Sequence, residues 1–173
     1  MGKVQTKGIR TEYSFVKGSD LPLSGRALIK ILSAVLDKGV PVRFRTKGFS
    51  MSPFIKDKDV VTLAPLQKAP PGVGDVIAFV LQGTEKLCVH RVVDKKGNLY
   101  VTKGDNSNVA DESVLRENLL GFVTRVERDG KEVFLGLGPE RFLIAFLGRR
   151  GLLLPLIFPF WKVIRTIMKK ELH

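Results

Sequence analysis

The sequence predicts a mostly β fold: a twisted antiparallel β-domain with a short amphipathic helix before it and amphipathic helices after it. Seven short stretches between residues 41 and 138 are rich in Val, Ile, Leu and Phe, and turn-forming Gly, Pro, Asn and Asp residues separate them. The first 40 residues contain one stretch of helical periodicity, and residues 139–173 are apolar and basic. We therefore divide the chain into a basic N-terminal segment with one helix (1–40), a β-domain (41–138) and a helical arm (139–173).

The predicted N-terminal helix covers residues 24–38. Ser24 is a favourable N-cap, and Gly39 can end the helix in the left-handed conformation that glycine adopts readily. Apolar side chains recur at helical spacing, at Leu28, Ile31, Leu32 and Val35. The helix is amphipathic and much shorter than the roughly 20 residues that span a bilayer.

The predicted strands follow in close succession. Residues 42–47 alternate strictly, with Val42, Phe44 and Thr46 on one face and three basic residues on the other, which is typical of a half-buried strand. The further predicted strands are 59–65, 75–81, 86–93, 99–103, 121–127 and 131–137. Asp129-Gly130 separates the last two and predicts a tight hairpin. Strands joined by such short connections pair in antiparallel fashion.

The C-terminal arm combines apolar runs with basic residues. Residues 141–148 and 158–170 both predict helices that are apolar on one side and basic at their ends. Between them, "GLLLPLIFPFW" is apolar but is interrupted by Pro155 and Pro159 and is too short to span a bilayer. Such a run is expected either to fold back on the β-domain or to lie in a membrane interface.

The net charge of +12 is unevenly distributed along the chain. Residues 1–47 carry ten Lys and Arg against three acidic residues, residues 48–138 carry twelve against twelve, and residues 139–173 carry seven against two. A nucleic-acid-binding protein usually carries its charge on the folded domain, so nucleic acid is not an expected partner. Basic flanks with apolar helices fit an anionic membrane surface instead.

The sequence shows no clear targeting segment and few residues that could bind a metal. The N-terminus has no apolar core typical of a signal peptide, and no run is long enough for a transmembrane helix, so we expect a cytoplasmic or a peripherally membrane-associated protein. The single cysteine, Cys88, allows no intrachain disulfide. One cysteine and one internal histidine cannot form an ordinary zinc site, so neither a metal nor a cofactor is expected.

Three polar positions in the β-domain could carry chemistry. Ser50 lies in "KGFSMSP", where Gly48 lets the chain turn sharply and backbone N–H groups accompany an exposed hydroxyl; its alternative role is that of a turn serine. His90 lies within an apolar strand, so its imidazole needs a hydrogen-bond partner, and it is either a general base or a satisfied core histidine. Asp105 and Asp111 lie in "TKGDNSNVAD" and either orient that histidine or shape a turn.

Cys88 offers a competing Cys–His arrangement. It lies two residues from His90, so both side chains are expected on the same face of the strand, pointing in parallel rather than at one another. A small apolar core residue is the simpler interpretation of Cys88.

Taken in order, these stretches resemble the boxes of the signal peptidase I family, whose superfamily includes self-cleaving repressors. "GFSMSPFIKDKDVV" resembles the nucleophile box, "GDVIAFV" the next strand, "VHRVV" the box of the general base, "TKGDNSNVAD" the Gly-Asp-Asn box and "LLGFVTRV" the closing strand. The resemblance covers residues 42–128. The common bacterial type has lysine as its base, whereas this chain has His90, as in the endoplasmic-reticulum and archaeal type.

The resemblance implies a serine endopeptidase that cleaves extended peptides after small residues. Ser50 would be the nucleophile, with its backbone N–H in the oxyanion hole; His90 would be the base, Asp111 the orienting acid and Asp105 a supporting acid. Met51 and Pro53, beside the nucleophile, would contact the substrate. Peptide or protein substrates are then the expected partners, and no cofactor is implied.

Two departures from the family keep alternatives open. The family has a transmembrane helix before its serine box, where this chain has only the helix predicted at 24–38, and Gly48 stands where some relatives have a serine that donates to the oxyanion. A non-catalytic relative that binds peptide or membrane is one alternative. A repressor-type DNA-binding regulator is the other, although residues 1–39 predict one helix where a helix-turn-helix needs two.

Overall fold

The computed structural model describes residues 25–67, 69–81, 83–84, 86–111, 113–157 and 159. Its elements, in chain order, are α1 (Gly25–Leu36), β1 (Val42–Arg45), β2 (Val60–Pro65), β3 (Val76–Val80), β4 (Leu87–Lys96), β5 (Leu99–Lys103), β6 (Val114–Leu115), the 3-10 turn η1 (Arg116–Asn118), β7 (Leu119–Arg128), β8 (Lys131–Glu132) and α2 (Arg141–Arg149). The predicted mostly β, antiparallel fold class is confirmed.

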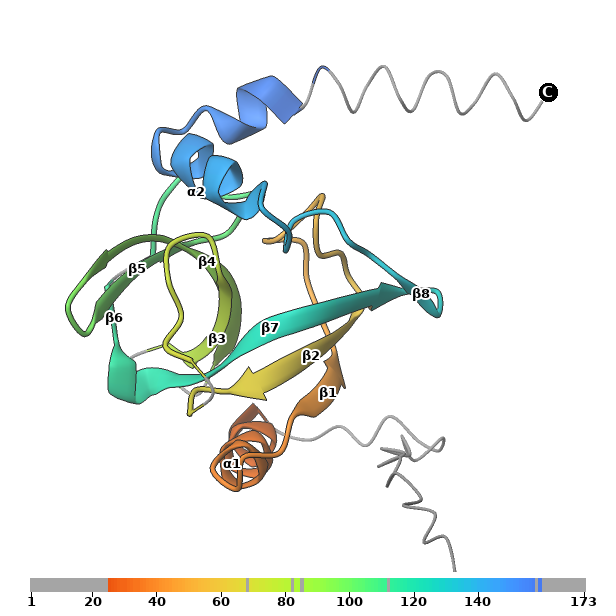
Figure 1. Cartoon of the computed structure of the whole chain (residues 1–173), viewed down its shortest axis with the longest axis vertical. Coiled ribbons are helices and arrows are strands. Elements are labelled where there is room, and N and C mark those ends of the chain that lie inside the picture. The colour runs from red at the N-terminus through yellow and green to blue at the C-terminus, as the bar shows by residue number, and fades with distance from the viewer. Residues whose placement is uncertain are drawn as a thin grey trace, which may run out of the picture.

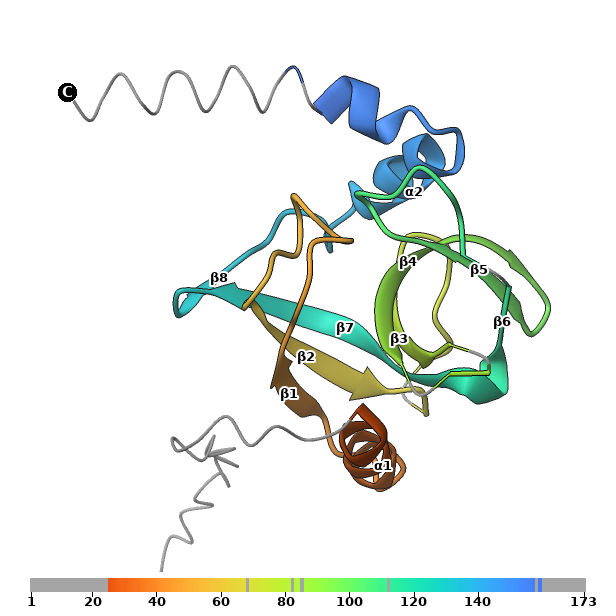
Figure 2. The ribbon, with the colours of Figure 1, turned by 180° about the vertical axis from the view of Figure 1, so that it is seen from behind.

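The strands form one antiparallel sheet in the order β1-β2-β7-β3-β4-β5-β6, with β8 paired to β7. The sheet curls strongly where β3, β4, β5 and β6 follow one another, while β1, β2 and β7 form a flatter section beside the curl (Figure 1). Seen from behind, α1 lies at the flat section and α2 at the opposite end of the molecule (Figure 2). Register shifts within β2–β7, β3–β7 and β4–β5 accompany this curvature, as bulges do in bent sheets.

The core has three parts, which explain why the helices lie where they do. Leu32 and Leu36 of α1 pack against buried residues of the flat section, such as Val61. Side chains inside the curl form the second part: Ile77, Phe79, Val92, Tyr100, Val114 and Leu119. Phe54 packs with Ile144 and Leu153 in the third part, which joins the loop after β1 to the C-terminal arm.

One predicted strand is wrong over most of its length. Residues 131–137 were expected to form a strand, but only β8 pairs, after which the chain leaves the sheet. Phe134 and Leu135 are exposed, so the apolar pattern there marks no buried strand face. Gly136 has a positive φ of 105°, and side chains rather than a neighbouring strand bind its backbone: Glu140 accepts from its N–H and Arg91 donates to its carbonyl. The two-residue β6 was not predicted because it is too short to show a pattern.

The described part of the C-terminal arm folds back on the β-domain. The helix predicted at 141–148 is confirmed as α2, and residues 153–157 are also helical, whereas the second predicted helix, 158–170, lies almost wholly outside the described residues. The Lys103 amine, on β5, donates to the Gly148 carbonyl at 2.7 Å, a favourable position for a cation at a helix C-terminus. In the part of the chain described here, no helix has the length and apolar character needed to cross a membrane.

Candidate active site

The turn after β1 presents Ser50 at the surface. Gly48 has a φ of 106°, a conformation that residues with a side chain rarely adopt, and its N–H donates to Asp57 Oδ1 at 2.8 Å. The hydroxyl of Thr46 donates to the Lys56 carbonyl at 2.8 Å, so both ends of the loop are bound together. The sharp turn expected from the sequence therefore exists, and it leaves Ser50 exposed.

Ser50, His90 and Asp111 form one hydrogen-bonded line, although they come from three separate parts of the chain. His90 Nε2 lies 3.0 Å from Ser50 Oγ, and His90 Nδ1 lies 2.6 Å from Asp111 Oδ2. A carboxylate only accepts hydrogen bonds, so Nδ1 carries the proton and Nε2 is left to accept from the serine hydroxyl. This is the arrangement in which an imidazole can remove a proton from a serine.

Two residues that the sequence analysis did not single out fix the acid and the base. Thr102, on β5, donates its hydroxyl to Asp111 Oδ2 at 2.8 Å, and its carbonyl accepts the Asp111 N–H at 2.8 Å. The Phe79 ring meets the His90 ring edge-on, with 6.0 Å between the ring centroids. Both sit at inward-facing strand positions, which sequence periodicity assigns to the core without indicating a role in a site.

The turn after β5 holds the serine loop in place. Asn106 donates its backbone N–H to the Ser50 carbonyl at 2.8 Å and its side-chain amide to the Phe49 carbonyl at 3.3 Å. Gly104 lies directly beneath the site: a Cβ placed on it would be 2.7 Å from the Ser50 carbonyl oxygen and 3.4 Å from His90 Nε2. Glycine is therefore required there by close approach of two backbones.

The substitution Gly104→Ala is expected to displace Ser50 from His90. The contacting atom belongs to the backbone and cannot swing away, so the loop must shift, and small misplacements of reacting groups cost about 10²-fold in rate. The readout is the rate at which Ser50 reacts with a fluorophosphonate, with circular dichroism as a check on folding. Gly72→Ala is the matched control, since a Cβ there comes no closer than 4.0 Å to any neighbour. Equal rates for the two variants would contradict this account of Gly104.

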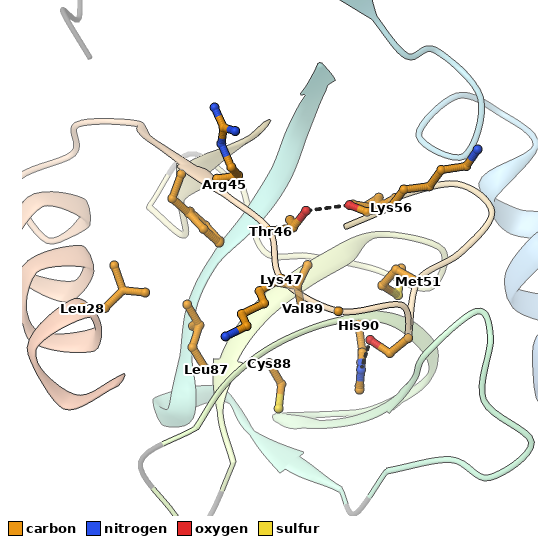
Figure 3. Close-up of a pocket in the computed structure, with 14 residues that line it drawn as sticks. Leu28, Arg45, Thr46, Lys47, Met51, Lys56, Leu87, Cys88, Val89 and His90 are labelled. Carbon is orange, nitrogen blue, oxygen red and sulfur yellow. Dashed lines mark hydrogen bonds between the residues drawn. The ribbon is translucent and has the colours of Figure 1, made fainter. Parts of the chain in front are cut away.

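A cleft of about 240 Å³ adjoins Ser50 and His90. Its apolar wall consists of Leu28, Phe44, Met51, Ile55, Leu87, Cys88 and Val89. Arg45, Lys47 and Lys56 also line it, and its described lining includes no acidic residue. The Lys47 side chain extends across the cleft toward Leu87 and Cys88 (Figure 3).

The two residues expected to contact substrate differ in position. Met51 lines the cleft but is almost fully buried and belongs to the main core, so it supports the wall of the cleft. Pro53 is not among the cleft-lining residues. The backbone N–H of Ser50 makes no hydrogen bond to another described residue, and so can donate to a developing oxyanion.

Asp105 forms no hydrogen bond with the His90 ring, whose two nitrogens are bonded to Asp111 and Ser50. Its carboxylate accepts two hydrogen bonds from Arg91, at 2.8 and 2.7 Å, and both side chains are buried. Burial raises the pKa of Asp105, and the Arg91 guanidinium opposes that shift. Arg91 also donates to the carbonyls of Gly74 and Gly136, so this ion pair joins three loops to β4 on the side of the strand opposite His90.

Cys88 lies beside the site without joining it. Both ring nitrogens of His90 already have partners, Ser50 and Asp111. Burial raises the pKa of the Cys88 thiol, and the nearby Asp111 carboxylate adds to that increase, so the nucleophilic thiolate is disfavoured. Among the residues that the structure describes, no three His, Cys, Asp or Glu side chains are grouped so that they could hold a metal ion.

No model of a protein family matches the chain, and no curated protein is significantly similar to it.

Proposed function

We propose that this chain is a serine endopeptidase of the signal-peptidase type, using Ser50, His90 and Asp111. The observation that carries the proposal is the hydrogen-bonded line from the Asp111 carboxylate through the His90 ring to an exposed Ser50 hydroxyl, at the edge of a cleft. A turn serine or a core histidine needs no such alignment of three polar side chains drawn from separate segments.

The geometry supports acyl transfer in two steps. His90 Nε2 accepts the hydroxyl proton as Ser50 Oγ attacks the peptide carbonyl, and the oxyanion accepts the Ser50 N–H. Asp111 stabilises the imidazolium, which then gives its proton to the leaving amine as the C–N bond breaks. Water, deprotonated by the same imidazole, attacks the ester at Ser50; the imidazolium returns the proton to Ser50 Oγ as the acid product leaves.

The cleft indicates the class of peptide that this site would accept. A space of about 240 Å³ suits a short extended segment with small side chains near the cut. Its lining brings positive charge from Lys47 and its basic neighbours and no negative charge from a described residue, so neutral or acidic peptides fit better than basic ones. Substrate choice by small residues is, in addition, what the family resemblance implies.

The proposal is tested by covalent labelling of the folded protein with a fluorophosphonate. An activated serine should gain one adduct, visible by intact mass, and peptide mapping should find it at Ser50. Ser52, two residues away in the same loop, is the internal control and should stay unmodified. Labelling elsewhere, or none at all with a folded protein, would favour the non-catalytic alternative and refute the proposal.

A further inference from the structure

Helix α2 has two faces of different character, and only one is covered. Ile144, Ala145 and Gly148 face the β-domain and are buried. On the outer face, Phe142, Leu143 and Phe146 are 54%, 59% and 48% exposed. Leu152 and Leu156, in the segment that follows the helix, are 45% and 49% exposed. We call these five exposed residues the apolar face of the arm.

Arginine side chains border this apolar face. The Arg141 guanidinium lies 4.7 Å from the centre of the Phe142 ring, and that of Arg150 lies 4.1 Å from the centre of the Phe146 ring. Such stacking holds a cation next to an exposed aromatic ring. Arg141 also forms an ion pair with Asp75 at 3.2 Å, so the positive charge beside the apolar rings comes from Arg150.

A second cleft, of about 390 Å³, opens next to the end of α2. Its charged lining consists of Lys103, Arg149, Arg150 and Asp94. Arg149 and Asp94 form an ion pair at 2.9 Å, which leaves Lys103 and Arg150 in excess. Lys103 is 7% exposed; its amine donates to the Gly148 carbonyl at 2.7 Å and, among the described residues, forms no ion pair with a carboxylate. A buried cation in that position favours an anion in the cleft.

We propose that the apolar face of the arm binds the surface of an anionic lipid bilayer, with headgroup phosphates reaching the Lys103–Arg150 cleft. Large exposed aromatic and leucine side chains bordered by arginines are typical of helices that lie in a membrane interface. Exposed apolar side chains gathered on one helix mark an interaction surface, and the neighbouring positive charge favours an anionic one. The sequence beyond residue 157, "FPFWKVIRTIMKK", continues the same apolar and basic composition.

The inference does not depend on the proposed peptidase activity, but it gives that activity a location. Phe54, four residues after Ser50, packs against Ile144 and Leu153 of the arm. The serine loop and the arm therefore form one packed unit. A bilayer bound at the arm would place Ser50 near peptides at the membrane surface.

The test is co-sedimentation of the full-length protein with vesicles. We expect binding to vesicles that contain phosphatidylglycerol, weak binding to vesicles of phosphatidylcholine alone, and loss of binding at high salt. The double substitution Phe142→Ser and Phe146→Ser should reduce partitioning at least about tenfold, because two aromatic side chains no longer enter the interface. Phe134→Ser is the control, since Phe134 is 76% exposed but lies outside α2.

Three results would overturn the inference: wild-type protein that stays in solution with both kinds of vesicle, binding unchanged by the double substitution, or an equal loss for Phe134→Ser. The second would assign binding to another segment, such as the end of the chain. Hydrogen exchange of the wild-type protein gives a measurement that needs no variant. Residues 141–157 should exchange more slowly when anionic vesicles are present, and unchanged exchange there would also count against the proposal.

Discussion

Ser50→Ala and His90→Ala are each expected to lower peptide cleavage by several powers of ten while the protein stays folded. The first removes the attacking oxygen and the second removes the group that accepts its proton, so each breaks the same step. Ser50 is exposed and lies in a turn, and the His90 ring is an edge of the cleft, so neither change opens a large cavity in the core. The two losses should be similar in size, and the double variant should lose little more, because groups that act as a unit are not additive.

Two control substitutions make this result specific. Ser52→Ala removes a hydroxyl from the same loop, and Cys88→Ala removes the thiol that lines the same cleft. Both should retain most of the activity, measured as kcat/KM on a short peptide with small residues near the cut. An inactive Cys88→Ala together with an active Ser50→Ala would show that the nucleophile has been misassigned.

Strand periodicity allowed most of the sheet to be predicted, because a strand with one buried face repeats every two residues. It failed at 131–137, where Phe134 and Leu135 repeat an apolar pattern but face solvent. Local periodicity cannot distinguish a buried strand face from an exposed apolar stretch, since burial depends on whether another element covers the face. β8 pairs with β7 through two residue pairs that flank the Asp129-Gly130 turn, and the chain then leaves the sheet toward Gly136, whose backbone is bound by side chains.

Site residues could be predicted where the local sequence pattern identifies them. They could not be predicted where their role depends on contacts between distant segments. Ser50 and His90 were singled out by a turn and by a polar residue in an apolar strand. Thr102 and Gly104 were not, because Thr102 matters through its hydrogen bond to Asp111 and Gly104 through its close approach to the serine loop. The local sequence around these two residues does not indicate such tertiary contacts.

The sequence alone did not show which of the two aspartates binds His90, but the position of Arg91 next to His90 distinguishes them. Asp105 and Asp111 lie in one turn-rich stretch, so either could have faced the imidazole. Arg91 follows His90 on β4 and therefore points to the opposite side, where a buried guanidinium needs a carboxylate. Asp105 is that carboxylate, which leaves Asp111 for His90.

This division predicts opposite effects for one chemical change made at two positions. Asp111→Asn should lower the rate by roughly 10²–10⁴-fold, because an amide cannot stabilise the imidazolium and favours the wrong tautomer of His90. Its effect on stability should be small, since the Asp111 side chain is still 21% exposed. Asp105→Asn should instead leave the Arg91 charge buried without its counter-ion, which destabilises proteins by about 3–5 kcal/mol.

The measurement is kcat/KM together with urea unfolding for both variants, so that rate and stability are separated in each protein. Asp105→Asn should show a lower unfolding midpoint and near-normal activity per folded molecule, at a temperature where it is folded. Asp111→Asn should show the reverse. If both variants lost a little activity and little stability, the aspartates would be ordinary turn residues. If Asp105→Asn lost activity in its folded state, the supporting role that the family resemblance implies for Asp105 would be the better description, exerted through Arg91 and β4 rather than by contact with His90.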